Sequence, residues 1–399
     1  MGADARGARH VAVAAVAAAV LVLLTGCQSS APTTTQAAAD AAKVVQKKAP
    51  LVSFDVQPAP YLVQVRPDAD VTVSTTNGKL TEVTVTDPKG RPVAGDLSAD
   101  AVTWTATGAL RLNTKYTVQA RAVNADGVAA EHSSEFTTLK PRRKLTTSIS
   151  PLDGSTVGVG MPIVVRLSHP VRNRAAVEQA LTVTSSKSIQ GAWSWLSDEE
   201  LHFRPREYWP AGSKVSLQVA LRDVDAGRGV WGAENRTIDF TIGASMVSVV
   251  NVDTLRMTVY RNGKVARVIP VSTGKAGFLT RNGIKVVSEK HQLKVMDART
   301  IGISPGDPEY YRLDVPYALR VTNSGEFVHA APWSVSSQGR ARVSHGCVGM
   351  SMSNAIWLYN QTHVGDIVQV VGSPRGLEPG NGWTDWNVKW STWLEGSAL

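Results

Sequence analysis

Cysteine is nearly absent from this sequence. Among its 399 residues only Cys27 and Cys347 occur, which excludes a fold that depends on a network of disulfide bonds. Long hydrophobic runs are lacking as well, because no stretch beyond about the first thirty residues could span a bilayer. The chain is therefore expected to fold around ordinary hydrophobic cores, and its 399 residues predict two or three domains.

Charge is not concentrated in any one segment. The formal net charge is +9, but the basic residues are scattered and do not cluster with aromatics on one helix, so nucleic acid is not expected as a partner. A positive balance suits a polyanionic neighbourhood, such as a cell wall or an anionic lipid surface. The glycine-bearing stretch 274–278 is too irregular to bind phosphate, and the sequence indicates no cofactor.

The first 26 residues have the pattern of a targeting segment. Arg6 and Arg9 precede an apolar run over 11–24, and the segment ends in Leu24-Thr25-Gly26-Cys27. This ending resembles a bacterial lipobox, so we predict that residues 1–26 are a lipoprotein signal peptide and that Cys27 is lipidated. Lipid would then anchor the protein to the outer face of the cytoplasmic membrane, in the cell envelope. An ordinary signal peptide with a chance cysteine is the alternative.

Short alternating stretches fill the first half of the remaining chain. Residues 27–50 are rich in Ala, Thr, Gln and Lys and predict a flexible tether. Residues 51–145 and 146–244 contain strand-like segments separated by turn signals, which is typical of small β-sandwiches. The stretch 181–184 parallels 83–86 at an offset of roughly one hundred residues, so we predict tandem immunoglobulin-like domains. Their expected role is that of a stalk or spacer.

The second half begins with another β-rich segment. Residues 245–372 are expected to form a mostly β domain with one embedded helix. The sequence Arg261-Asn262-Gly263-Lys264 predicts a hairpin turn, and Ser351 or Ser353 could cap a helix that extends to about Gln361.

A tryptophan-rich tail, residues 373–399, ends the chain. Trp386, Trp390 and Trp393 have the i, i+4, i+7 spacing of one helix face. Such a stripe is more often a packing face than a ligand platform, so we expect the tail to pack on the protein's own domains. Binding of glycan strands is the alternative.

His329 and Cys347 are the candidates for catalysis. A thiol becomes a good nucleophile when it is deprotonated, and a neighbouring imidazole or the start of a helix is expected to favour the thiolate. His329 follows a strand-like run, and Gly346 before the cysteine would let an acyl carbonyl approach the backbone. A structural buried cysteine, or a zinc site of His329, His345 and Cys347, would be alternatives to a cysteine–histidine acyl-transfer site, although no fourth zinc ligand has a suitable spacing.

The stretches around these residues resemble the L,D-transpeptidase (YkuD-type) catalytic domain. The most specific are Pro270–Lys275, Phe327–Ser334 and Ser344–Cys347, and the tail stretch Asp385-Trp386-Asn387 also matches. Together with the two sandwiches and the lipobox, they resemble the lipoprotein L,D-transpeptidases of actinobacteria. The implied fold class is mainly β: two tandem immunoglobulin-like β-sandwiches, a YkuD-type β-rich catalytic domain with one embedded helix, and the tail.

The resemblance also implies roles for individual residues. The nucleophile falls on Cys347 and the general base on His329, which the backbone carbonyl of Ala330 would orient. The loop around the nucleophile, whose backbone amides would stabilise an oxyanion, comprises Ser344, His345, Gly346 and Cys347. The side chains that correspond to the substrate pocket are Tyr311, Met296 and Trp333.

Two positions depart from the family pattern. Gly349 stands where relatives commonly have Asn or Arg, and Ile301 stands where a lid tyrosine is found. Both departures concern substrate contacts more than the chemistry.

The implied reaction is the formation of 3→3 peptidoglycan cross-links. Cys347 would take an acyl group from a tetrapeptide donor stem and pass it to the side-chain amine of an acceptor stem. Carbapenem β-lactams would be expected to acylate the same sulfur. The alternatives are an L,D-carboxypeptidase or hydrolase that acts on the same stems, and a non-catalytic cell-wall-binding lipoprotein. Papain-like peptidases place cysteine before histidine, and sortases space the two residues further apart.

Overall fold

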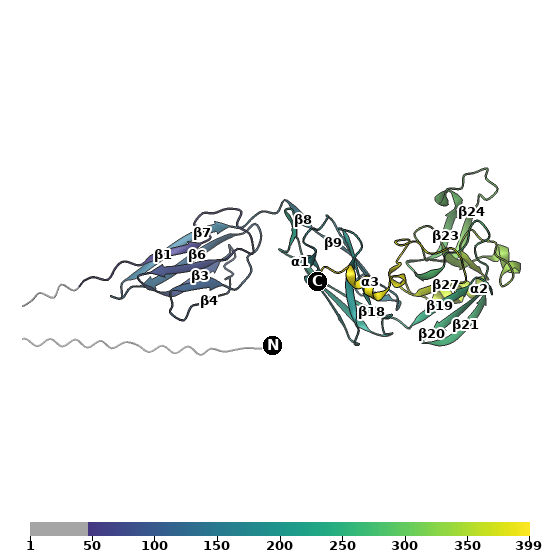
Figure 1. Ribbon diagram of the computed structural model, residues 1–399, viewed down its shortest axis with the longest axis horizontal. Coiled ribbons are helices and arrows are strands. Elements are labelled where there is room, and N and C mark those ends of the chain that lie inside the picture. Colours follow the sequence, from purple (N-terminus) through teal and green to yellow (C-terminus); the bar gives the residue numbers. More distant parts are fainter. Residues whose placement is uncertain (1–46) are drawn as a thin grey trace, which may run out of the picture. The chain divides into compact units, whose positions relative to one another are not determined.

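The computed structural model of the protein describes residues 47–399. The predicted signal peptide, the predicted lipidation site at Cys27 and most of the predicted tether lie outside the described residues. Within 47–399 no helix has both the length and the apolar character needed to cross a membrane. The described chain is mainly β, as predicted (Figure 1).

The first β-sandwich follows from a regular alternation of side chains. In β6 (Lys115–Val123) every second residue from Tyr116 to Ala122 is buried, which is the period of a strand with one face on a core. β6 pairs with β3 (Lys79–Thr86) and β7 (Ala129–Thr137) in one sheet. The other sheet has the order β1-β2-β5-β4 and consists of β1 (Ser53–Gln57), β2 (Thr72–Thr76), β5 (Thr103–Ala106) and β4 (Gly95–Leu97).

The second β-sandwich repeats this pairing. β12 (Leu181–Ser185) pairs with β15 (Lys214–Ala220), which pairs with β18 (Asn235–Ile242). β12, β15 and β18 thus follow one another as β3, β6 and β7 do, so the predicted repeat is confirmed. The facing sheet has the order β13-β14-β11-β9 and consists of β13 (Gly191–Trp195), β14 (Glu200–Pro205), β11 (Ile163–Leu167) and β9 (Thr147–Ser150).

Three additions distinguish the second sandwich. β10 (Thr156–Val157) adds a parallel strand beside β18. The short helix α1 (Arg174–Gln179) begins at Asn173, whose side chain accepts a hydrogen bond from the Ala176 N–H. A small sheet has the order β16-β17-β8 and consists of β16 (Asp225–Gly227), β17 (Val230–Gly232) and β8 (Arg143–Leu145).

Two further sheets form a third β-rich region. Asn262 and Gly263 have φ values of 49° and 77°, as a type I′ turn requires, and they join β20 (Arg256–Arg261) to β21 (Lys264–Pro270) as predicted. The first sheet has the order β21-β20-β19-β27-β22, and its other strands are β19 (Met246–Asn251), β27 (Ile367–Val371) and β22 (Gly283–Val286). The second consists, in order, of β23 (Glu289–Asp297), β24 (Arg312–Arg320), β25 (Phe327–Ala330) and β26 (Val348–Met350).

The helix predicted after the cysteine packs on this second sheet. α2 (Met352–Gln361) is capped by Ser351, whose hydroxyl accepts from the Asn354 N–H at 3.4 Å. Its buried residues Ala355 and Leu358 share a core with residues of β25 and β26. The strand that carries His329 is therefore held between a helix and its neighbouring strands. Two 3₁₀ turns complete the region: η1 (Ala298–Ile301) and η2 (Pro332–Ser337).

The tryptophan tail packs on the second sandwich, as expected, but it is not one helix. η3 (Asp385–Asn387) and α3 (Trp390–Glu395) are separated by Val388 and Lys389, whose ψ values of 129° and 146° are extended. The predicted continuous helix face is therefore wrong.

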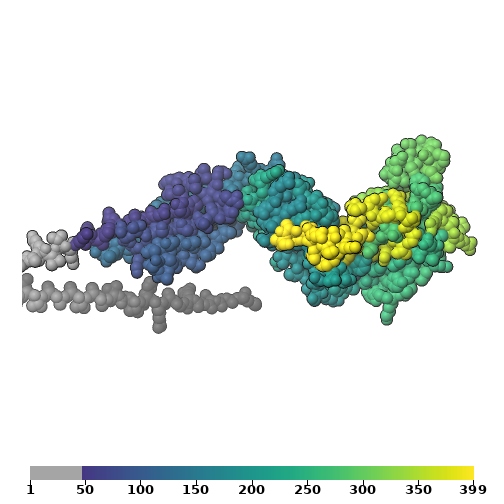
Figure 2. Space-filling model, in the orientation of Figure 1, coloured from purple at the N-terminus to yellow at the C-terminus, as the bar shows by residue number. Residues whose placement is uncertain are grey.

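Two anchors on the second sandwich account for the break in the tail. The Trp386 Nε1 donates to the carbonyl oxygen of Gly160 at 2.8 Å, and the Trp393 Nε1 donates to that of Ala192 at 3.0 Å. The extended residues between the two rings let each reach its own acceptor. In Figure 2 the tail is the yellow segment.

Candidate active site

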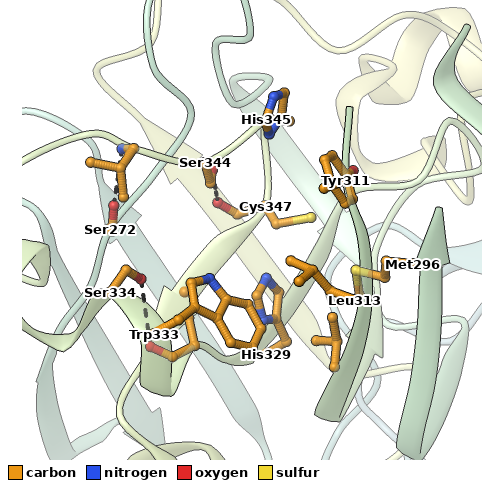
Figure 3. A pocket seen from close by; sticks show the side chains of 14 residues that line it. Ser272, Met296, Tyr311, Leu313, His329, Trp333, Ser334, Ser344, His345 and Cys347 are labelled. Carbon is orange, nitrogen blue, oxygen red and sulfur yellow. Dashed lines mark hydrogen bonds between the residues drawn. The ribbon is translucent and has the colours of Figure 1, made fainter. Parts of the chain in front are cut away.

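Two neighbouring strands bring Cys347 and His329 to one cavity. β25 and β26 are parallel, with His329 opposite Gly349, and Cys347 directly precedes β26. Neighbouring strands lie about 4.8 Å apart, so the thiol and the imidazole reach the cavity from adjacent positions. Figure 3 shows the sulfur of Cys347 inside the cavity, above the rings of His329 and Trp333. The cavity has a volume of about 320 Å³.

The cavity walls are mostly apolar and aromatic. Eight of the predicted site residues line it: Cys347, His329, His345, Ser344, Tyr311, Met296, Trp333 and Gly349. Six further residues complete the lining: Ser272, Leu313, Val315, Ala331, Ser334 and Val343. The other two predicted residues, Ala330 and Gly346, adjoin the site through hydrogen bonds of their backbone.

The tautomer of His329 is fixed by its own strand. Its Nδ1 lies 2.7 Å from the carbonyl oxygen of Ala330, and a carbonyl oxygen can only accept a hydrogen bond. Nδ1 therefore carries the proton of the neutral ring, and Nε2 keeps its lone pair. Burial lowers the pKa of His329, although the bond to Ala330 opposes this, so the ring is neutral near pH 7.

The thiol of Cys347 is protonated in the free protein. The residue is 9% exposed, and burial raises the pKa of the thiol to about 12. The N–H of Phe327 opposes this rise, Glu326 adds to it, and Lys285 and Arg320 oppose it. Burial therefore disfavours the expected thiolate in the resting site, where the thiol donates to the Gly325 carbonyl oxygen at 3.7 Å and the neutral imidazole of His329 lines the same cavity.

The start of α2 does not adjoin the sulfur either. The helix begins at Met352, and the three residues of β26 lie between it and Cys347. Three residues of strand span about 10 Å, whereas the effect of a helix terminus fades within its first turn. The helix supports β25 and β26 mechanically instead of stabilising a thiolate.

The turn before the cysteine is held by hydroxyl groups. Gly346 has a φ of +120°, a conformation that side chains disfavour. The Thr280 hydroxyl donates to the Gly346 carbonyl oxygen at 2.8 Å. The Ser344 hydroxyl donates to the Cys347 carbonyl oxygen at 2.6 Å and accepts from the Gly346 N–H at 3.2 Å. These bonds fix the backbone from Ser344 to Cys347.

His345 is held at the rim of the cavity. Its Nε2 lies 2.7 Å from a carboxylate oxygen of Glu309, which also accepts from Lys275 Nζ at 2.5 Å. The ring of His345 packs against those of Phe278 and Tyr311, with centroids 4.5 Å and 4.8 Å away. Glu309 thus ties the loop before β24 to the turn that carries the cysteine.

The two departures from the family pattern lie in different places. Gly349 lines the cavity, and a Cβ at this position would lie 3.0 Å from the Cβ of Ala331, so a larger residue requires Ala331 to shift. Ile301 is not among the lining residues, and its side chain lies near Gly325. Only the first departure therefore changes the cavity wall.

Metal binding finds no support in the described part of the chain. Within residues 47–399 no group of three His, Cys, Asp or Glu side chains is arranged to hold a metal ion. His329 Nδ1 faces Ala330, and His345 Nε2 faces Glu309, so one nitrogen of each ring already has a protein partner.

Several residues that shape the site carry no recognisable motif. Thr280, Lys285 and Glu326 surround the cysteine turn from the inner side of the domain. They lie in ordinary strand-like sequence, and their relation to Cys347 arises only from the fold. Ser272 could have been found, because it lies within the motif Pro270–Lys275.

Comparison with known proteins agrees with this architecture. Residues 63–225 match the family described as bacterial Ig domain, and residues 245–370 match the L,D-transpeptidase catalytic domain. The chain is 39% identical over 337 residues to L,D-transpeptidase 2 of Mycobacterium tuberculosis (strain CDC 1551 / Oshkosh), covering 84% of this chain and 82% of the relative. It is 36% identical over 369 residues to L,D-transpeptidase 5 of Mycobacterium tuberculosis (strain ATCC 25618 / H37Rv), covering 90% and 80%.

A solved structure extends the comparison. The LD transpeptidase LdtMt1 in complex with imipenem superimposes with a TM-score of 0.51 and 37% identity, covering 58% of this chain and 100% of that chain. Fold and site together define a transpeptidase catalytic domain preceded by bacterial immunoglobulin-like sandwiches. The chain belongs to the L,D-transpeptidase family.

Proposed function

We propose that the protein forms 3→3 peptidoglycan cross-links by acyl transfer through a thioester on Cys347. The observation that supports this most is the placement of the thiol and the His329 ring in one cavity of about 320 Å³, with a free lone pair on Nε2. A buried structural cysteine would not need such a cavity or such a partner.

In the first half-reaction the neutral pair acts together. His329 Nε2 takes the proton of the Cys347 thiol as the sulfur attacks the carbonyl carbon between the third residue and the terminal D-Ala of the donor stem. The imidazolium then gives this proton to the leaving D-Ala nitrogen, the C–N bond breaks, and a thioester remains. Concerted transfer avoids forming a free thiolate, which burial disfavours here.

The second half-reaction reverses the roles. The side-chain amine of a diamino acid on a neighbouring stem attacks the thioester carbon, and His329 Nε2 takes a proton from the amine. The C–S bond breaks, the proton returns to sulfur, and an amide cross-link is released. No external energy source is required, because one amide bond replaces another.

Backbone amides would stabilise the oxyanion in both halves. The family resemblance points to His345, Gly346 and Cys347. Since the Gly346 N–H already donates to the Ser344 hydroxyl, the amides of His345 and Cys347 are better placed to serve. Ser344 and Gly346 would then act by holding the turn. Tyr311, Met296 and Trp333 would form the walls of the donor-stem pocket.

A carbapenem would test the nucleophile. Incubation of the full chain with a carbapenem is expected to add one drug mass to the protein, and Cys347→Ala is expected to show no adduct by intact-mass spectrometry. His329→Ala should fold normally but acylate about 100-fold more slowly or worse, because the base is lost. The matched control is His291→Ala, which should acylate like the parent protein. His291 is a half-buried histidine on β23 that pairs with Glu289. An adduct that persists in Cys347→Ala, or unchanged kinetics in His329→Ala, would reject the proposal.

Hydrolysis of the same stems is the competing activity. Mass spectrometry of purified disaccharide-tetrapeptide incubated with the protein separates the two outcomes, because cross-linking yields stem dimers and hydrolysis yields trimmed monomers. Monomers alone would replace the transferase by an L,D-carboxypeptidase.

We also propose that Cys27 is lipidated and anchors the enzyme at the outer face of the cytoplasmic membrane. The sequence Leu24-Thr25-Gly26-Cys27 supports this placement. The full chain expressed in a bacterial host should partition with membranes and carry acyl groups on Cys27. The Cys27→Ala variant should be absent from the membrane fraction. Equal partitioning of the parent and the variant would contradict anchoring through Cys27.

A further inference from the structure

Behind the turn of Cys347 lies a cluster of four charged residues, which we call the Glu326 cluster: the buried Lys285 and Glu326, the partly buried Arg281 and the exposed Glu378. Lys285 is 1% exposed and Glu326 is 3% exposed, and Lys285 Nζ donates to Glu326 Oε2. Glu326 Oε1 accepts from the Arg281 N–H at 3.0 Å and from its Nη1 at 3.1 Å. Arg281 Nε also pairs with Glu378 at 2.5 Å. Two cations therefore pair with the buried Glu326 carboxylate, and the exposed Glu378 is also paired with Arg375 at 3.5 Å.

Burying charged side chains in a core costs free energy that apolar side chains would not cost. Removing ions from water costs several kcal/mol for each ion, and replacing a buried pair by apolar side chains is often neutral or stabilising. Lys285 lies in β22, next to the buried Val286, where an apolar residue would satisfy the sheet. Burial lowers the pKa of Lys285, and Glu326 opposes this. The cluster therefore requires an explanation other than stability.

The position of the Glu326 cluster, next to the turn of Cys347, supplies such an explanation. A Cβ on Gly346 would lie 3.4 Å from Glu326 Oε1, so the carboxylate lies against the backbone of the cysteine turn. The residue before Arg281, Thr280, donates to the Gly346 carbonyl oxygen. The residue before Glu326, Gly325, has its carbonyl oxygen 3.7 Å from the Cys347 sulfur. The residues that precede Arg281 and Glu326 in the chain therefore contact the segment that carries the nucleophile.

We propose that the Glu326 cluster is a positioning device for acyl transfer: it supports the Gly346–Cys347 turn from inside the domain, and Lys285 cancels the Glu326 charge behind the sulfur. A lone carboxylate at this distance would oppose negative charge on the sulfur or on a nearby oxyanion. With Lys285 in place the turn gains a rigid support without that penalty. This inference rests on the proposed function, because it assigns the cluster to the same nucleophile.

Other polar groups face Cys347 from the surrounding elements. Arg320 on β24 pairs with Glu289 at 3.0 Å, and its guanidinium lies over the ring of Phe327. His329 faces the sulfur from β25 as a neutral ring, and burial raises the pKa of Tyr311 to about 12, so its phenol is neutral as well. His345 is paired with Glu309. Lys285 and Arg281 are thus the cations that share hydrogen bonds with the carboxylate nearest to the turn, and Lys285 is the more deeply buried of the two.

Alkylation of the single thiol tests the charge balance without turnover. In a full chain carrying Cys27→Ser, Cys347 is the only cysteine, and its reaction with iodoacetamide can be followed by intact mass at several pH values between about 7 and about 10. Lys285→Met leaves Glu326 charged beside Arg281, and alkylation should slow about tenfold, which corresponds to one pKa unit. The double variant Lys285→Met/Glu326→Gln restores the charge balance and should return to within about twofold of the parent.

Lys290→Met is the matched control. Lys290 is a half-buried lysine of the same region whose Nζ donates to the Tyr359 and Thr362 carbonyl oxygens. Its replacement should leave the alkylation rate at every pH unchanged. Equal slowing in Lys290→Met and Lys285→Met, or no recovery in the double variant, would reduce the cluster to a structural role and overturn the proposal.

Two further measurements distinguish an effect of the cluster on Cys347 from unfolding of a variant and from failure of the proposed function. Thermal unfolding monitors each variant, and if Lys285→Met does not fold, Arg281→Gln provides a milder loss of positive charge nearer the surface, with slowing of about threefold expected. Unchanged alkylation in a folded Arg281→Gln would then count against the proposal. Alkylation needs no substrate, so failure of the parent protein to form a carbapenem adduct would reject the proposed function alone.

Discussion

The two β-sandwiches share one pairing of strands but differ in what covers them. In the first, β5 has the alternating burial of a strand with one free face. In the second, nearly all of β14 is buried, although its sequence Leu-His-Phe-Arg alternates in the same way. Leu201 and Phe203 face the sandwich core, whereas His202 and Arg204 face the C-terminal tail. The same fold therefore leaves one face of a strand free in the first copy and uses the corresponding face as a docking surface in the second.

Polar contacts make this docking specific. His202 lies between two carboxylates, with Nδ1 2.6 Å from Asp385 and Nε2 2.8 Å from Glu200. Arg204 donates to the Val388 carbonyl oxygen at 2.8 Å. Three rings surround its guanidinium at 4.7–5.1 Å: Trp386, Trp390 and Trp393. The spacer role expected for the sandwiches is thus incomplete for the second one, which binds the tail of the catalytic domain.

The largest expected loss of stability comes from replacing a tryptophan of the tail. Trp393→Ala removes a buried ring and its bond to Ala192 and should destabilise the second sandwich by about 4 kcal/mol. Trp104→Ala removes a ring of similar burial from the first sandwich and should cost about as much there, without loosening the tail. Urea unfolding followed by tryptophan fluorescence distinguishes them, since ten of the eleven tryptophans lie outside the first sandwich. Equal shifts of one transition in both variants would show that the sandwiches unfold together and would break the comparison.

A somewhat smaller loss of stability is expected when a charged residue that holds the tail is replaced. Asp385→Ala leaves the buried His202 with one carboxylate partner and should cost about 3 kcal/mol. In the first sandwich the pair Lys115–Glu135 is exposed, so Glu135→Ala should cost at most about 0.5 kcal/mol. Chemical denaturation of both variants checks the contrast. A cost below about 1 kcal/mol for Asp385→Ala would mean that the tail is held by its tryptophans alone.

The smallest effect is a dependence on pH. Burial alone would lower the pKa of His202, but Asp385 and Glu200 raise it to about 9. Because the folded state holds this proton more tightly, the stabilisation is complete below the ordinary histidine pKa of about 6.5 and is lost as the pH rises through about 9. The fluorescence-detected stability should fall by about 2–3 kcal/mol across this window.

His202→Gln should flatten this profile. The first sandwich should not share it, because its shifted carboxylates Asp68, Asp87 and Asp100 have lowered pKa values and titrate in acid. A fall in stability of the same size in His202→Gln would assign the pH dependence to another group.

Local signals in the sequence predicted the elements that depend on few residues. The Asn262-Gly263 hairpin and the Ser351 cap are each decided within one turn, so both were predictable. The break in the tail was not, because it depends on acceptors at Gly160 and Ala192, about two hundred residues away. For the same reason the burial of His202 and Arg204 could not be read from the alternation of β14.

The active site also combines features that local sequence predicts with features that only the fold determines. Cys347, His329 and the residues of their motifs were predictable, and most of them line the cavity. The protonation of the thiol was not, because it follows from burial by the surrounding strands, and the motif alone suggested a thiolate. The Glu326 cluster could not be predicted from the sequence either, since Lys285 and Glu326 are 41 residues apart and have no shared motif.

The docked tail also joins the second sandwich to the catalytic domain a second time. The covalent connection is short, from the end of β18 at Ile242 to the start of β19 at Met246, and the tail returns to the same sandwich from the far end of the chain. A protease that cut between these strands would produce two polypeptides held together by noncovalent bonds. Such a nicked enzyme would migrate as two bands in a denaturing gel and as one particle in native chromatography, with its thiol still able to react.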